Sequence, residues 1–127
     1  MTKIELNPEK DLDIDLPNLS VEFREFPLKM YRYSQYRAEI ETKRDIAKAK
    51  LKELRATLYK KIRSNPIEKH TQSSLEAEVD SDPLVTAAVL ALIRAEHDAS
   101  TWAGAVESMR AKKDVLIQLG SDRRKEM

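Results

Sequence analysis

Residues 27–64 constrain the fold most, because this segment contains no Gly or Pro after its first residue. It is rich in Lys, Arg, Glu, Ala and Leu, which lose little side-chain entropy in a helix. Asn65 and Pro66 follow, and a residue before proline avoids helical backbone angles. The sequence therefore predicts one long helix over residues 27–64, and the other segments must supply its packing partner.

Apolar side chains recur along this segment at the spacing of one helix face. They are Tyr33, Ile40, Ala47 and Leu54, seven residues apart, with Leu51, Leu58 and Ile62 on the same face or beside it. So narrow a stripe does not stabilise a lone helix in water. The predicted helix must therefore pack against another one.

Two further helices are predicted beyond the break. A short helix over residues 71–80 is capped by Thr71 or Ser73. A long helix over residues 83–119 begins with a cap and a first-turn proline, and Gly120 ends it. Its predicted apolar face consists of Leu84, Ala88, Leu92, Ala95, Ala99, Trp102, Val106, Met109 and Leu116. We expect Trp102 to be buried either against a neighbouring copy or in the chain's own core.

The predicted fold is all-α, a long antiparallel helical hairpin with the short helix at its turn, because the two long helices have similar lengths. An acidic extended N-terminal arm (residues 1–26) precedes the hairpin, and a charged tail (residues 120–127) follows it. Two helices bury too little apolar surface to offset the ordering entropy of a 127-residue chain. We therefore expect hairpins to pack side by side in a homo-oligomer.

The arm contains the alternating sequence DLDIDL at residues 11–16. In an extended chain Leu12, Ile14 and Leu16 point one way, which is typical of a half-buried strand; the alternative is a loop that lies along a helix. The alternating carboxylates do not predict a calcium loop, because the central glycine and a properly placed glutamate are missing. An acidic arm that folds over basic helix surface is the better interpretation.

Charge is distributed unevenly along the chain. The whole chain has a net charge of +1, but residues 28–64 hold twelve Lys and Arg against four Asp and Glu, a net charge of +8. Residues 1–27 and residues 65–82 each have a net charge of −4. The basic helix therefore faces either a polyanion or acidic neighbours.

Little in the sequence suits catalysis. There is no cysteine, and no metalloprotease, phosphate-loop or nucleophile-elbow motif. His70 lies in the connector, and His97 stands between Glu96 and Asp98, which point in different directions on a helix. We therefore expect no enzyme, no cofactor and no metal site.

The longest near-apolar run, residues 83–93, is too short to span a bilayer. The acidic N-terminus does not resemble a secretory signal, and the absence of cysteine fits a reducing compartment. We expect a cytoplasmic protein with no membrane partner.

Cations alternate with aromatic rings on the basic helix. Lys29, Tyr31, Arg32, Tyr33, Tyr36 and Arg37 begin the pattern, and the candidate nucleic-acid-binding residues are Lys48, Lys50, Lys52, Arg55, Tyr59, Lys60, Lys61 and Arg63. Sites for single-stranded nucleic acid combine cations along the phosphates with rings on which bases stack. The competing interpretation is a solvated face with core tyrosines, although such a face would mix signs more evenly.

Five segments follow one another along the chain: IDLPNLS in the arm, MYRYSQYRAEIE at the start of the long helix, LYKKIRSNP at its end, the connector TQSSLEAEVDSDP, and a second long helix with a Trp midway. This order resembles phage UvsY-type recombination mediators. Members of that family are small helical proteins that form rings, bind single-stranded DNA and help to load a RecA-like recombinase onto strands covered by a single-strand-binding protein.

The resemblance implies that Lys50, Lys52, Arg55, Lys60, Lys61 and Arg63 contact DNA. This chain departs from the family at Tyr59-Lys60-Lys61 and Asn65-Pro66, where members often have an aromatic pair and a Gly-containing turn. The resemblance also implies a phage protein that acts in the host cytoplasm. The expected function is DNA-binding mediation of recombination and repair.

Two other functions fit the same elements. An oligomeric coiled-coil structural or adaptor protein, such as a phage assembly scaffold or chaperone, would not bind nucleic acid. An inhibitor of a host protein would present the acidic arm as a nucleic-acid mimic.

Overall fold

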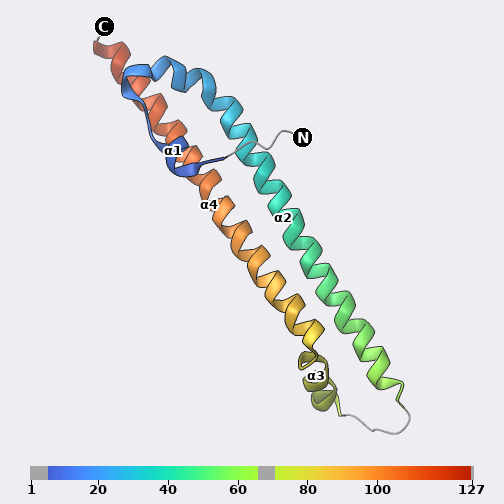
Figure 1. Ribbon diagram of the computed structural model, residues 1–127. Coiled ribbons are helices and arrows are strands. Elements are labelled where there is room, and N and C mark those ends of the chain that lie inside the picture. Colours follow the sequence, from blue (N-terminus) through green and yellow to red (C-terminus); the bar gives the residue numbers. More distant parts are fainter. Residues whose placement is uncertain (1–5, 66–70, 127) are drawn as a thin grey trace. The chain divides into compact units, whose positions relative to one another are not determined.

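The computed structural model describes residues 6–65 and 71–126, and every regular element within these ranges is helical (Figure 1). In chain order these are α1 (Pro8–Leu12), a 3-10 helix η1 (Leu16–Asn18), α2 (Leu19–Arg63), α3 (Gln72–Asp80) and α4 (Pro83–Glu126). The prediction of an all-α chain, in which a long helix packs against a C-terminal helix, is confirmed. His70 and Pro66 lie outside the described residues.

The chain divides into two compact units. The first consists of Met1–Glu39 and Ser100–Met127, and the second of Ile40–Ala99. Both α2 and α4 contribute to both units. Among the described helices, none combines the length and the apolar character needed to cross a membrane.

The first long helix begins earlier than the sequence predicts. α2 starts at Leu19, and Pro27 lies inside it, although proline there removes a backbone N–H donor. Leu19 and Phe26 are only 5% and 7% exposed, so burial of these side chains stabilises helical backbone before the proline. The prediction of an extended arm over residues 1–26 was therefore wrong for residues 19–26.

Within residues 6–18 the alternating pattern forms no strand. Asn7 caps α1 by accepting a hydrogen bond from the Lys10 backbone N–H at 3.3 Å. Leu12 and Ile14 pack against the core of the first unit, whereas Leu16 is 60% exposed. The strand alternative is therefore wrong, and the loop alternative holds only for residues 13–15, because Pro8–Leu12 is an α-helix and Leu16–Asn18 a 3-10 helix.

The second long helix also continues past its predicted end. Gly120 lies inside α4, which reaches Glu126, so the predicted tail over residues 120–127 is helical as far as it is described. A Cβ atom at Gly120 would lie 2.9 Å from Cζ of Phe23. The glycine therefore permits close approach of a ring rather than ending the helix.

Both predicted helix starts in the second unit are confirmed. Thr71 caps α3, and its side chain accepts a hydrogen bond from the Ser74 backbone N–H at 3.2 Å. The Asp82 carboxylate accepts one from the Leu84 backbone N–H at 2.8 Å. Each side chain satisfies an N–H that has no partner inside its helix.

The core of the first unit forms between the early part of α2 and the late part of α4. Its buried residues are Leu19, Phe26, Tyr33, Val106, Met109 and Leu116. Phe23 lies close to Gly120, and the Tyr36 ring meets Trp102 edge-on with centroids 4.5 Å apart. Residue numbers rise along α2 as they fall along α4, so the two segments are antiparallel in this unit. Trp102 belongs to the chain's own core.

The core of the second unit is smaller. Leu51, Val79 and Val85 are buried, and they are surrounded by the partly buried Leu54, Leu58, Tyr59, Ile62, Ala88, Val89 and Leu92. Val79 belongs to α3, so the short helix contributes to this core. The assignment of Leu84 to the apolar face was wrong: Leu84 is 63% exposed and its neighbour Val85 is 1% exposed. Contacts with Leu51 and Val79 select the residue that turns inward.

Replacing Gly104 by alanine is expected to raise the free energy of unfolding by about 1 kcal/mol, because glycine inside a helix has a large entropy to lose. A Cβ atom at Gly104 would meet no other heavy atom within 4 Å, so there is no opposing clash. Urea unfolding measures the change. Gly120→Ala is the control, and its free energy of unfolding should rise less, because the added Cβ meets Phe23. A lower free energy of unfolding in Gly104→Ala would show that the added Cβ has no room there.

Candidate nucleic-acid interface

All eight predicted nucleic-acid-binding residues lie on the part of α2 that belongs to the second unit. The exposed ones are Lys48, Lys50, Lys52, Lys60, Lys61 and Arg63. Arg55 and Tyr59 are half-buried. Residues 46–65 contain seven cations and a single carboxylate, that of Glu53. This part of α2 therefore has a strongly positive surface.

Helical periodicity divides these residues between different sides of α2. Lys48, Lys52, Arg55, Tyr59 and Arg63 follow at intervals of three or four residues and line one side, which we call the basic stripe. Lys50, Lys60 and Lys61 point away from the stripe by about 100° or more, since each residue turns the helix by about 100°. The structure thus brings five of the eight residues together.

Two members of the basic stripe also hold the second unit together. The Arg55 guanidinium lies 3.6 Å from the Asp80 carboxylate of α3, and Tyr59 packs against the apolar core. The Arg55–Asp80 pair confirms that acids of the connector lie near the basic helix. Among residues 6–65 and 71–126, no carboxylate pairs with Lys48, Lys52 or Arg63.

Several cations and rings near the start of α2 have intramolecular partners instead. Tyr33 is fully buried, and its hydroxyl donates a 2.6 Å hydrogen bond to the Asp11 carboxylate. Lys29 lies 3.6 Å from the same carboxylate, and Arg37 lies 3.8 Å from Glu107. The early part of the aromatic and basic pattern therefore serves packing of the first unit.

A buried lysine anchors the N-terminal segment of that unit. Lys112 is 5% exposed, and its Nζ lies 2.9 Å from the Glu22 carboxylate and donates to the backbone carbonyls of Asp11 and Asp13. Burial alone would raise the pKa of Glu22. The hydrogen bonds from Lys112 and from the Asp15 backbone N–H, with the nearby positive charges, instead hold this pKa below its ordinary value of 4.5.

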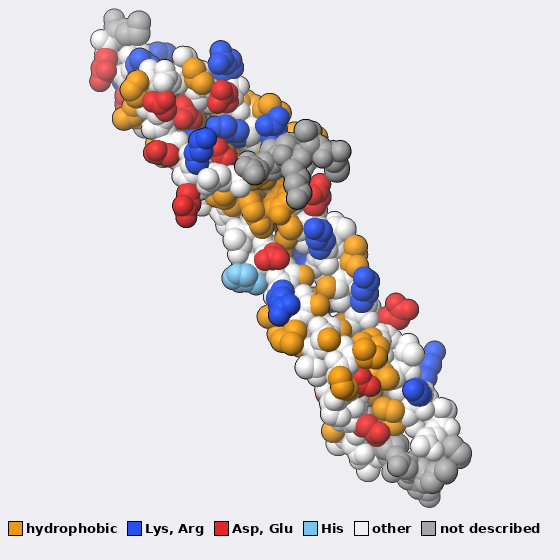
Figure 2. All heavy atoms as spheres, in the orientation of Figure 1, with side chains coloured by type: hydrophobic (Ala, Val, Ile, Leu, Met, Phe, Trp, Pro, Cys, Tyr) orange, Lys and Arg blue, Asp and Glu red, His pale blue; other side chains and the backbone are white. Residues whose placement is uncertain are grey.

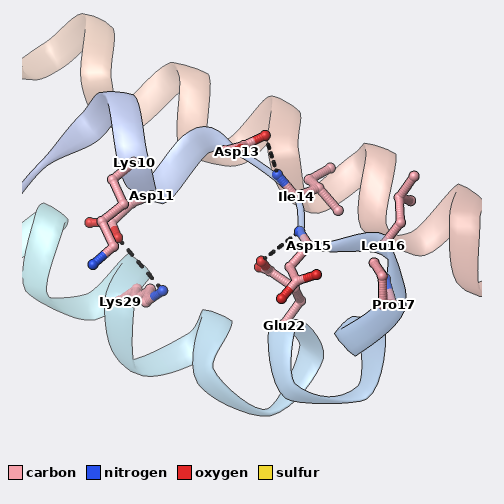
Figure 3. Close-up of a pocket in the computed structure, with 9 residues that line it drawn as sticks. All are labelled: Lys10, Asp11, Asp13, Ile14, Asp15, Leu16, Pro17, Glu22 and Lys29. Carbon is pink, nitrogen blue, oxygen red and sulfur yellow. Dashed lines mark hydrogen bonds and ion pairs between the residues drawn. The ribbon is translucent and has the colours of Figure 1, made fainter.

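An open pocket of about 540 Å³ lies beside this network (Figure 3). The charged residues that line it are Lys10, Asp11, Asp13, Asp15, Glu22 and Lys29. In Figure 3 the Lys29 amine reaches the Asp11 carboxylate, and the Asp15 backbone N–H points at Glu22. In the described part of the chain, no group of three His, Cys, Asp or Glu residues could hold a metal ion. Residues that line the pocket also join the N-terminal segment to α2, through the Asp11–Lys29 ion pair and the hydrogen bond from Asp15 to Glu22.

Sequence reasoning missed Lys112, although a signal was present. Position 112 lies three residues after Met109 and four before Leu116, so it falls on the apolar face of α4. A lysine there must either reach solvent or find carboxylate and carbonyl partners. The partners are Glu22 and the segment that contains Asp11, and no local pattern connects them with Lys112.

No family model matches this chain, and neither a curated protein nor a solved structure matches it. The functional interpretation therefore rests on the chemistry of the residues and on the order of the sequence elements.

Proposed function

We propose that the chain is a non-enzymatic, homo-oligomeric protein that binds single-stranded DNA along the basic stripe of α2. Its role would be that of a recombination mediator in the host cytoplasm, with a RecA-like recombinase and a single-strand-binding protein as partners. The DNA-binding part of the proposal draws on the described residues, and the mediator role draws on the resemblance to UvsY-type proteins.

The observation that carries the proposal is the contrast between the two parts of α2. Near its start, Lys29 and Arg37 are paired with carboxylates of the same unit. Late in the helix, the cations at the outer edge of the stripe, Lys48, Lys52 and Arg63, have no such pairs among the described residues. Cations on one side of a helix that no described carboxylate neutralises are well placed to contact the phosphates of a strand.

The geometry suits electrostatic binding. From Lys48 to Arg63 the stripe extends over about 22 Å at 1.5 Å per residue, which accommodates several phosphates. Displacement of counterions from the strand would drive binding, so affinity would depend strongly on salt and little on base sequence. Tyr59 is half-buried and lies between the cations along the stripe, so its ring is the candidate for base stacking.

The test is a charge reversal of these three stripe cations, Lys48→Glu, Lys52→Glu and Arg63→Glu, in one chain. At about 0.1 M salt, the loss of three phosphate contacts should weaken binding to a labelled oligo(dT) strand by about 100-fold. The slope of log affinity against log salt should become shallower by about 2. Fluorescence anisotropy over a salt series measures both.

The resemblance also implies that Lys50, Lys60 and Lys61 contact DNA, so the matched control reverses three exposed cations of α4 instead, Lys113, Arg124 and Lys125, which changes the net charge equally. This control should keep the wild-type salt slope. Equal losses in the two triple variants would contradict a defined stripe. A wild-type chain that ignores oligonucleotide at low salt would contradict DNA binding altogether.

Exposed apolar residues on α4 also favour the structural or adaptor alternative, in which charges only keep the assembly in solution. Both functions require a homo-oligomer, but the structural or adaptor protein would bind no nucleic acid. Gel filtration with and without the oligonucleotide, at low and high salt, separates the two functions.

A further inference from the structure

One cation in the middle of the basic stripe has an acidic partner from another helix. Arg55 lies between Lys52 and Tyr59 along the stripe, and its Nη2 atom is 3.6 Å from the carboxylate of Asp80, the last residue of α3. Both residues belong to the second unit. A strand that follows the stripe must therefore pass a carboxylate of the chain itself.

The guanidinium of Arg55 is incompletely satisfied by this contact. The 3.6 Å distance to Asp80 is longer than a hydrogen bond. The Nε atom of Arg55 is buried, and within residues 6–65 and 71–126 it has no hydrogen-bond partner. The two side chains are 41% and 59% exposed, and an ion pair that water reaches so easily is weak. Arg55 therefore keeps donors for a better acceptor.

Local helix chemistry does not account for an acid at position 80. Asp80 stands at the C-terminal end of α3, where the helix dipole disfavours a negative charge. The C-cap of α3 is Ser81, and the carboxylate that caps α4 is that of Asp82. Among the described residues, the partner of the Asp80 carboxylate is Arg55. The interaction that the structure gives this carboxylate is therefore with the basic stripe.

We infer that Asp80 competes with a phosphate of the bound strand for Arg55 and thereby weakens binding to the basic stripe. The inference rests on the proposed function and names a carboxylate that regulates the same site. A phosphate can accept two hydrogen bonds from one guanidinium, whereas Asp80 lies too far from Arg55 to accept one. The phosphate therefore displaces Asp80, and the intramolecular ion pair is lost when the strand binds.

The competing acid belongs to an acidic part of the chain. Residues 65–82 have a net charge of −4, and Figure 2 shows acidic side chains among basic ones on the face in view. Glu76 lies one turn before Asp80 on the same face of α3, and its carboxylate accepts a hydrogen bond from Gln72. In the described part of the chain, Asp80 is the one of these two acids that contacts Arg55. Comparing the two acids therefore isolates the contact from the charge.

Replacing Asp80 by asparagine should tighten binding of the full chain to a labelled oligo(dT) strand. The expected gain at about 0.1 M salt is about 3–5-fold, because binding no longer breaks an exposed ion pair. The slope of log affinity against log salt should become steeper by up to about 0.7, the share of one phosphate on a single strand. Fluorescence anisotropy over a salt series measures both.

Glu76→Gln is the matched control, because it removes one negative charge from the same face of α3 and leaves the Arg55–Asp80 contact intact. It reports how much the strand gains when repulsion by α3 is reduced. Salt screens charges that are exposed to water, so this variant should tighten binding by less than about 1.5-fold. Circular dichroism and urea unfolding check that both variants are folded like the wild type.

The same replacement in a chain without the Arg55 guanidinium separates competition from repulsion. In an Arg55→Gln background, Asp80→Asn should tighten binding no more than the control does, because the coupling between two partners disappears with either one. A full gain in that background, or equal gains in Asp80→Asn and Glu76→Gln, would overturn the inference. Weaker binding by Asp80→Asn would also overturn it, because Asp80 would then position Arg55 for the phosphate.

The wild type keeps the two proposals apart. If the wild type binds the strand and Asp80→Asn binds it equally well, the competition alone is contradicted. If the wild type ignores the oligonucleotide at low salt, the proposed function is contradicted and the competition with it.

Discussion

Replacing Lys112 by alanine is expected to lower the free energy of unfolding by about 3–5 kcal/mol, the usual cost of removing one partner from a buried ion pair. Lys112 is 5% exposed, and it satisfies the Glu22 carboxylate and the Asp11 and Asp13 carbonyls together. The alanine variant leaves these oxygens without their donor inside the first unit. Urea unfolding followed by circular dichroism measures the loss.

Lys113→Ala is the matched control, because Lys113 is the exposed neighbour on the same helix. It should change the free energy of unfolding by less than about 0.5 kcal/mol. If both alanine variants were equally stable, the Lys112 network would contribute nothing to the fold.

The effect of Lys112→Ala should depend on pH in a defined direction. The pKa of Glu22 is lowered in the folded chain, so its contribution to stability is present above the ordinary value of 4.5 and is lost as the pH falls. Without the lysine, burial would raise the pKa of Glu22 instead. The difference in stability between wild type and variant should therefore narrow below pH 4.5.

Replacing Tyr33 by alanine is expected to lower the free energy of unfolding by about 3–5 kcal/mol, as for other buried aromatic residues. This is the second large expected effect. Tyr33 is 0% exposed, and its ring lies 6.1 Å from that of Trp102 between the two long helices of the first unit. Its removal leaves a cavity that the rigid helices cannot easily close. Thermal and urea unfolding measure the loss.

Two further tyrosine variants divide this effect into its parts. Tyr33→Phe keeps the ring and removes only the 2.6 Å hydrogen bond to Asp11, so its free energy of unfolding should fall by about 1 kcal/mol. Tyr31→Ala removes a ring that is 60% exposed and should change little. A loss as large in Tyr31→Ala as in Tyr33→Ala would contradict the burial difference.

The Tyr33 hydroxyl also predicts behaviour at high pH. Burial raises the pKa of Tyr33 well above its ordinary value of 10, and the hydrogen bond and charge of Asp11 raise it further. The stability that this shift contributes is present below pH 10 and is lost as the pH rises. Tyr33→Phe cannot ionise there, so it should lose less stability than the wild type in alkaline buffer.

Much of the fold could be predicted from residues alone. The apolar stripe that contains Tyr33, Ile40 and Leu51 is buried as its spacing indicates. The starts of α3 and α4 follow from Thr71 and Asp82, because a capping side chain acts on backbone groups only a few residues away. Properties that depend on neighbours within one helical turn are therefore readable from sequence.

Helix ends that depend on distant contacts could not be predicted. Pro27 is a local start signal and Gly120 a local stop signal, yet α2 begins before the proline and α4 continues past the glycine. Leu19 and Phe26 gain burial by remaining helical before the proline, and Phe23 covers the glycine. Burial of large side chains outweighs a local preference of about 1–3 kcal/mol.

The candidate interface shows the same division. The excess of cations in residues 46–65 is a property of the sequence. Which cations remain available is decided by partners far along the chain, because Asp80 pairs with Arg55, Asp11 with Lys29, and Glu107 with Arg37.

The sequence by itself determined the helical class, the positive charge of α2 and the starts of two helices, since these follow from propensities and charges that act over one or two turns. Only the tertiary structure decided that Lys112 is buried and that Leu84 faces outward. Both depend on which atoms of distant segments meet, and a difference of one residue turns a helical side chain by about 100°, from core to solvent.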